Sequence, residues 1–130
     1  MRQLVALFGA AEKGVFQKPY LLSKLPQLFD YLGNPPKESE GLSFAIQAIL
    51  YNREVLFFRV EEEGFSEKDY LHGLKYLGNK EYVQKVHALC LPGVGDPEIL
   101  AASHLVCDIH KSFLIATQKD LYDFLTSTPS

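Results

Sequence analysis

The sequence of 130 residues has no tryptophan, one methionine and two cysteines. Cys90 and Cys107 cannot complete a zinc site by themselves, and none of the four histidines falls at ligand spacing from them. Both cysteines lie inside apolar segments, so we expect buried free thiols rather than a disulfide framework. The first apolar run, residues 4–8, is too short for a membrane span or a signal-peptide core, which leads us to expect a cytoplasmic location and no membrane partner.

An excess of positive charge is also missing. The chain has 13 Lys and Arg against 16 Asp and Glu, a formal net charge of −3, and no cluster of basic residues. Proteins that bind nucleic acid usually carry a basic face, so we expect no nucleic-acid partner. Hydrophobic residues make up 47% and charged residues 22%, as in ordinary globular proteins, and no linker or repeat interrupts the chain. Residues 1–130 are therefore interpreted as a single domain.

What the chain has is a repeated order of short segments. Four apolar runs each lead into a polar turn, and each turn leads into a helix-like pattern; the runs are residues 4–8, 55–60, 86–91 and 113–116. Strands that alternate with helices form a mostly parallel sheet. The predicted fold class is α/β: a small three-layer α/β/α domain with an open sheet of four strands, or five, Rossmann-like or flavodoxin-like.

The helices are predicted from apolar spacing and from their end signals. Leucines from Leu21 to Leu32 recur at helical spacing, with Pro26 near the first turn. Ser66, Asp96 and Thr117 each stand where an N-cap is expected, at the start of a further helix. Residues 126–130 are expected to form a frayed tail.

Residues 42–50 fit two structures. As a strand they would form a hairpin with residues 55–60 through residues 51–54, adding a fifth strand. As a helix, Leu42, Ala45, Ile46 and Ile49 would share one face. Alanine and glutamine are poor strand formers, which favours the helix.

The turns after the strands define the predicted site, because in such sheets ligands bind outside the carboxyl ends of the strands. Glycines in these turns would aim backbone N–H groups at an anion, and a helix N-terminus would attract it. The full dinucleotide fingerprint and the Walker A lysine pattern are both absent. The residues expected to bind a ligand are Gly9, Glu12, Lys13, Gly93, Gly95, Asp96, Thr117 and Lys119.

Catalysis and metal binding have fewer candidates. Glu12, Lys13 and Asp120 are the acid–base candidates, but no motif identifies a reaction. Glu61 and Asp96 are the oxygen donors that a divalent cation would use. The alternatives are that Asp96 and Thr117 cap their helices, and that Glu61 belongs to a solvated acidic run. The sequence therefore assigns no metal site, no cofactor and no catalytic activity.

Two functions remain open at this point. One is binding of a small anionic ligand, including a nucleotide, in the crevice at the strand ends. The other is a non-catalytic regulatory or protein-interaction domain that acts as a homodimer, since the aromatic residues outnumber what one small sheet must bury. The first predicts a hollow lined by the turn residues, and the second predicts a filled crevice with exposed aromatic residues elsewhere.

Overall fold

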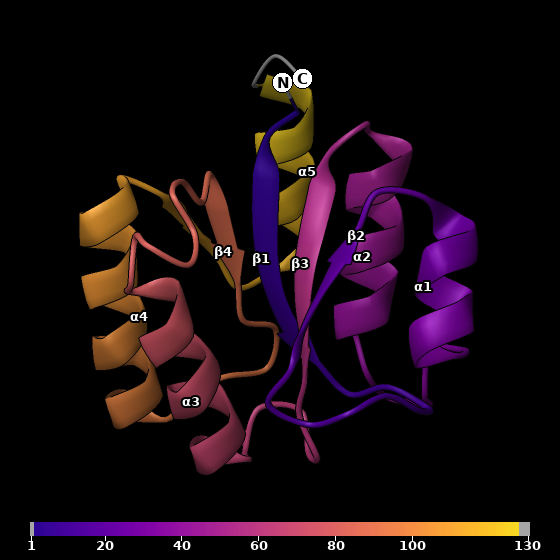
Figure 1. Ribbon diagram of the computed structural model, residues 1–130, viewed down its shortest axis with the longest axis horizontal. Coiled ribbons are helices and arrows are strands. Elements are labelled where there is room, and N and C mark those ends of the chain that lie inside the picture. Colours follow the sequence, from indigo (N-terminus) through magenta and orange to yellow (C-terminus); the bar gives the residue numbers. More distant parts are fainter. Residues whose placement is uncertain (1, 128–130) are drawn as a thin grey trace.

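The computed structural model describes residues 2–127, which form a mixed α/β fold (Figure 1). The strands are β1 (Leu4–Gly9), β2 (Pro19–Leu22), β3 (Glu54–Arg59), β4 (Ala88–Cys90) and β5 (Phe113–Ile115). The helices are α1 (Leu25–Leu32), α2 (Gly41–Leu50), α3 (Glu67–Leu77), α4 (Pro97–His110) and α5 (Gln118–Ser127). Thr126 and Ser127, expected in the tail, form the last turn of α5, and residues 128–130 of that prediction lie outside the described part.

The sheet has five strands in the order β2-β3-β1-β4-β5. Its strands run parallel except β2, which pairs antiparallel with β3, from Pro19 opposite Phe58 to Leu22 opposite Val55. The four apolar runs of the sequence analysis are the four parallel strands. The prediction of a mostly parallel sheet is confirmed. Of the two strand counts that the sequence allowed, five is correct, but the fifth strand is β2 and not residues 42–50.

The extra strand comes from a segment predicted as helix. Leu21 and Leu22 fit the leucine spacing of α1, but they lie in β2, and α1 begins only at Leu25. The break falls at Ser23 and Lys24, whose backbone N–H groups both donate to the side-chain oxygen of Gln27, at 2.8 and 3.1 Å. Pro26 then stands in the first turn of α1, where its missing N–H is not needed.

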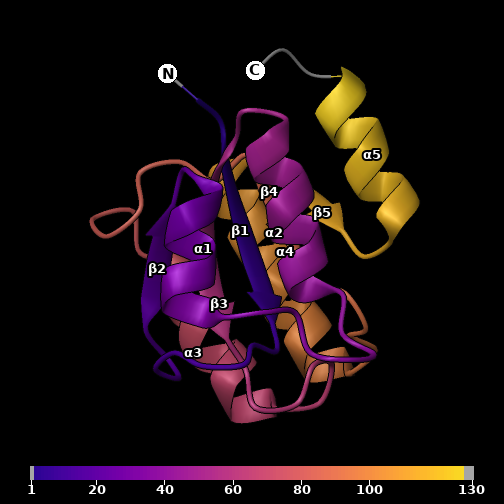
Figure 2. The same cartoon turned by 90° about the vertical axis from the view of Figure 1, so that its right-hand side faces the viewer.

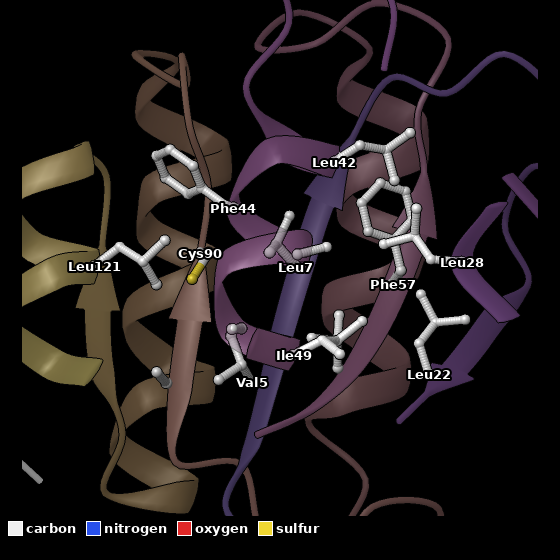
Figure 3. Packing of buried hydrophobic residues seen from close by; sticks show 14 of the residues in the cluster. Val5, Leu7, Leu22, Leu28, Leu42, Phe44, Ile49, Phe57, Cys90 and Leu121 are labelled. Atoms are coloured by element: carbon white, nitrogen blue, oxygen red, sulfur yellow. The ribbon is translucent and has the colours of Figure 1, made fainter. Parts of the chain in front are cut away.

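Residues 42–50 are helical, as α2. Leu42, Ala45 and Ile49 are buried on one face of this helix, while Leu50 at its end is exposed. In Figure 3 the side chains of Leu42 and Ile49 lie beside Phe57 and Leu7 on the sheet, and the ring of Phe44 lies on the side of Cys90 and Leu121. The apolar face at helical spacing therefore decided between the two predicted structures.

Alternate residues of the strands serve two separate hydrophobic clusters, because successive strand side chains point to opposite faces. Val5, Leu7 and Phe57 pack with buried residues of α1, α2 and α5 (Figure 3). Ala6, Phe8 and Phe58 pack with buried residues of α3 and α4. Figure 1 shows α3 and α4 on the left of the sheet and α1 and α2 on its right.

One buried charge joins α5 to the rest of the fold. Arg53 is 2% exposed, and its guanidinium donates to the side chain of Gln3 at 3.0 Å and to the carbonyl of Tyr51 at 2.7 Å. A longer bond of 3.5 Å reaches the carbonyl of Leu125 in α5.

Cys90 is buried and Cys107 partly buried, both as free thiols. None of the helices in residues 2–127 has the length and apolar character that crossing a bilayer requires.

Candidate functional site

The predicted site lies at the carboxyl edge of the sheet, the ends of β1, β3, β4 and β5 together with the turns that follow them. In Figure 2 the arrowhead of β1 points to this edge, at the bottom of the view. The strand order places the turn after β1 between the turns after β3 and β4. Whether a ligand can enter depends on what the polar groups of these turns already contact.

Gly9 ends β1 against the start of α2. A Cβ at Gly9 would lie 2.6 Å from the Cα of Gly41 and 2.9 Å from the carboxylate of Glu63. The glycine is therefore required for close approach of two backbone segments. Its place is explained by this contact without a ligand.

Glu63 fills the space where an anion was expected. Its Oε1 accepts from the backbone N–H groups of Ala10, at 3.0 Å, and Gly41, at 3.1 Å, and its Oε2 accepts from that of Glu40 at 2.6 Å. These donors belong to the turn after β1 and to the N-terminus of α2, whose dipole favours negative charge. The chain thus supplies its own carboxylate to an anion-binding arrangement.

Glu12 and Lys13 close the end of α1. Their backbone N–H groups both donate to the carbonyl of Leu32 at 3.1 Å, and Oε1 of Glu12 accepts from the N–H of Asn34 at 3.2 Å. Both side chains are exposed. Their backbone and the Glu12 carboxylate therefore have an evident structural task at this end of the helix.

The turn after β4 is held by its own residues as well. Oδ1 of Asp96 accepts from the N–H groups of Glu98, at 2.8 Å, and Ile99, at 3.2 Å, which confirms the expected N-cap of α4. Gly93, at φ 80°, places its carbonyl against Gly64 in the turn after β3. Gly95 is exposed, with no neighbouring atom within 4 Å of an added Cβ.

The surroundings of this turn are negatively charged. A hydrogen bond and repulsion from Glu98 raise the pKa of Glu67, with a smaller contribution from Asp96. An anion near Gly93 and Gly95 would meet these carboxylates. Three-residue groups of His, Cys, Asp or Glu that could hold a metal ion are absent from residues 2–127, and this includes the surroundings of Glu61 and Asp96.

The turn after β5 begins α5. Oγ1 of Thr117 accepts from the N–H of Asp120 at 3.1 Å, so this N-cap prediction is also confirmed. Lys119 pairs with Asp123 at 2.8 Å, one turn along the helix, and this carboxylate raises the pKa of Lys119. Thr117 and Lys119 thus make contacts typical of a helix start.

Two residues of this edge were missed by the sequence analysis, Glu63 and Arg59. Arg59 donates to the carbonyl of Gly14 at 2.6 Å, and its guanidinium lies 4.2 Å from the centre of the Phe16 ring. It is the one charged residue near the end of an otherwise apolar run, a signal that could have identified it. Nothing in the run 61–63 distinguishes Glu63, whereas the structure exposes Glu61 and Glu62.

Four hollows of the described surface stand out, and one of them adjoins the predicted site. Two of them, with volumes of about 850 and 530 Å³, adjoin the connection between α3 and β4. A third, of about 330 Å³, lies between β5 and α5 and includes Asp120 of the predicted residues. The fourth, of about 250 Å³, is an apolar groove between α3 and α4.

Comparisons with protein-family models, with curated proteins and with solved structures give no match for this chain. Function must therefore be argued from the geometry of the chain itself.

Proposed function

We propose that this chain is a cytoplasmic, non-catalytic interaction domain that works as a homodimer through the edge strand β5. The observation that carries the proposal is a free strand edge beside an exposed aromatic side chain. Across the sheet the parallel strands follow the order β3-β1-β4-β5, so the second parallel strand of the chain lies outside the first. This order supports a flavodoxin-like three-layer arrangement with β5 at one end.

The carboxyl edge gives less support to a catalytic or ligand-binding function. Glu63, Asp96 and Thr117 already accept hydrogen bonds from the chain's own backbone. Binding of a small anion there stays a prediction, and it would require these groups to be displaced.

The outer edge of β5 is available for pairing. The N–H of Phe113 donates to the carbonyl of His87 on the β4 side, and the carbonyl of Ile115 accepts from Leu91 on the same side. Hydrogen-bonding directions alternate along a strand, so the N–H and C=O of Leu114 point away from β4. Phe113 is 61% exposed next to them. The opposite edge strand, β2, begins with Pro19, which has no N–H to offer.

A second copy of this chain fits the edge by symmetry and by charge. In an antiparallel pair centred on Leu114, residue 111 of one copy faces residue 117 of the other. Lys111, exposed before β5, would then approach the first turn of the other copy's α5, which carries Asp120. A two-fold axis makes this contact twice.

Sedimentation velocity over a range of concentrations tests the proposal. The wild-type chain should show a monomer–dimer equilibrium, and Phe113→Lys should weaken it at least about tenfold by placing two like charges diagonally across the axis. Leu105→Lys, at a side chain 65% exposed on α4, is the matched control and should leave the equilibrium unchanged. A wild-type monomer at high micromolar concentration, or equal weakening by both variants, would refute the β5 interface.

A further inference from the structure

The hollow of about 530 Å³ lies at the amino edge of the sheet, opposite to the predicted site. It is lined by Leu4 at the start of β1, by Glu54 at the start of β3 and by His87 just before β4. In Figure 2 the connection between α3 and β4, which forms one wall, projects at the end away from the arrowhead of β1. Small-molecule sites are typically about 300–1,000 Å³, so the volume is adequate.

The floor of this amino-edge hollow is apolar. Leu4, Leu21 and Leu56 line it, and Leu21 stands opposite Leu56 in the pairing of β2 with β3, so both point to the same face. Leu21 remains 56% exposed although it lies in the sheet. Helices α3 and α4 thus leave part of this face uncovered, and an apolar ligand surface could cover it.

The wall of the hollow is aromatic. The rings of Tyr76 and Tyr82 stack with centroids 5.0 Å apart and planes inclined by 15°. Tyr82 is nevertheless 63% exposed, so this residue remains accessible to a ligand. Both tyrosines also line the adjoining hollow of about 850 Å³, and the two hollows therefore share this wall. A planar ring is the chemical group that stacks best on such a surface.

The rim is positively charged in a chain whose net charge is −3. Arg2 and Lys85 line the amino-edge hollow, and Lys75 and Lys80 line the adjoining one. Glu54 is the carboxylate among the residues that line the two hollows, and it lies 3.8 Å from Arg2. Arg2 also donates to the carbonyl of Ser23, and Lys85 to that of His110, but a guanidinium and an ammonium each have further N–H donors.

His87 adds a neutral donor. Its Nδ1 accepts from the backbone N–H of Leu4 at 3.0 Å, so the proton of the neutral ring is on Nε2. An apolar floor, an aromatic wall and a cationic rim with an imidazole donor therefore meet in one place.

We propose that the amino-edge hollow binds a small ligand that joins a planar aromatic ring to an anionic group, of the class of nucleoside monophosphates. The ring stacks on Tyr82 above the leucine floor, and the anionic group takes hydrogen bonds from Arg2 and Lys85. This assignment is independent of the proposed dimer, because β5 contributes no residue to the hollow.

The first experiment titrates the purified chain with adenosine 5′-monophosphate at up to millimolar concentration, followed by isothermal calorimetry and by backbone amide NMR shifts. Adenosine and inorganic phosphate are titrated separately. We expect saturable binding of the monophosphate and binding at least about tenfold weaker for each part alone, since ring and anion contacts both contribute. No saturable binding of the monophosphate would overturn the proposal, as would equal binding of adenosine, which would leave the cations without a role.

Matched variants locate the site. Tyr82→Ala should weaken binding at least about fivefold, the lower end of base-stacking effects, while Tyr122→Ala, at an exposed tyrosine of α5, should not. Arg2→Gln should weaken binding, while Lys13→Gln at the carboxyl edge should not. Amide spectra of the unbound variants establish that each is folded. If Lys13→Gln weakens binding and Arg2→Gln does not, the ligand binds at the carboxyl edge. If a single-stranded hexanucleotide binds more tightly than the monophosphate, the hollow is a nucleic-acid site. Either result overturns the proposal.

Discussion

The polar side chains at the two edges of the sheet have different partners. At the carboxyl edge, the side chains of Glu63, Asp96 and Thr117 each accept a hydrogen bond from a backbone N–H of the same chain. At the amino edge, cations and tyrosines surround a hollow of about 530 Å³. Residue types typical of a binding site also make good helix caps, so a turn rich in them is available to a ligand only where the chain leaves them free.

The largest effect should come from filling the contact at Gly9. Gly9→Ala places a methyl group 2.6 Å from the backbone of Gly41, so β1 or α2 must shift, and we expect a loss of about 3 kcal/mol in the free energy of unfolding. Gly95→Ala is the control, because an added Cβ there meets nothing within 4 Å. Urea denaturation measures both. Equal losses would mean that the carboxyl edge is not closely packed.

A smaller loss should follow from Glu63→Gln. The amide keeps one acceptor oxygen but turns an NH₂ group toward backbone donors and removes the charge at the N-terminus of α2. We expect the free energy of unfolding to fall by about 2 kcal/mol, in the range of charge-assisted hydrogen bonds. Glu61→Gln, at an exposed side chain of the same run, should stay within about 0.5 kcal/mol of wild type. If the two variants behave alike in urea, Glu63 does not hold the edge together.

The smallest effect concerns the amino edge and pH. Burial, assisted by Lys85 and Arg53, lowers the pKa of His87 from its ordinary value of 6.5. The unfolded chain therefore takes up this proton first as the pH falls, so the contribution of His87 to stability is present above pH 6.5 and declines below it. His87→Asn keeps an acceptor for the N–H of Leu4 and removes the titration.

Free energies of unfolding measured at pH 7 and pH 5 test whether the stabilisation by His87 declines as the pH falls. The decline between the two pH values should be smaller in His87→Asn than in wild type, and His104→Asn, at an exposed position of α4, should retain the wild-type decline. A decline in His87→Asn as large as in wild type would show that the neutral imidazole contributes nothing at this edge.

Much of the fold could be predicted from local patterns, because its parallel strands are short apolar runs and two of its helices, α4 and α5, carry side-chain caps at their starts, whereas the expected cap Ser66 makes no such bond to α3. Asp96 and Thr117 cap α4 and α5 as expected. Strand β2 could not be predicted this way, since Leu21 and Leu22 match the spacing of α1 as well as that of a strand. What makes β2 a strand is its pairing with β3, more than thirty residues further along the chain, and single-segment periodicity contains no information about that pairing.

The candidate site was less predictable than the fold. Strand order decides which turns are neighbours, and it is a property of the whole chain. The run 61–63 offers three equal carboxylates, and only the packed structure selects Glu63. The amino-edge hollow was missed because its residues come from distant segments, Arg2, Leu21, Glu54 and Tyr82 among them, and none of these stands in a recognisable motif.

The central place of β1 has a consequence for how the chain is made. A ribosome releases β1 first, yet its neighbours β3 and β4 follow some fifty and eighty residues later, and Glu63 is needed to join the turn after β1 to α2. During synthesis the apolar strand therefore has no strand partner until nearly half of the chain has emerged. A nascent chain arrested before residue 60 should be a good client for chaperones, and one released after residue 91 a poor one.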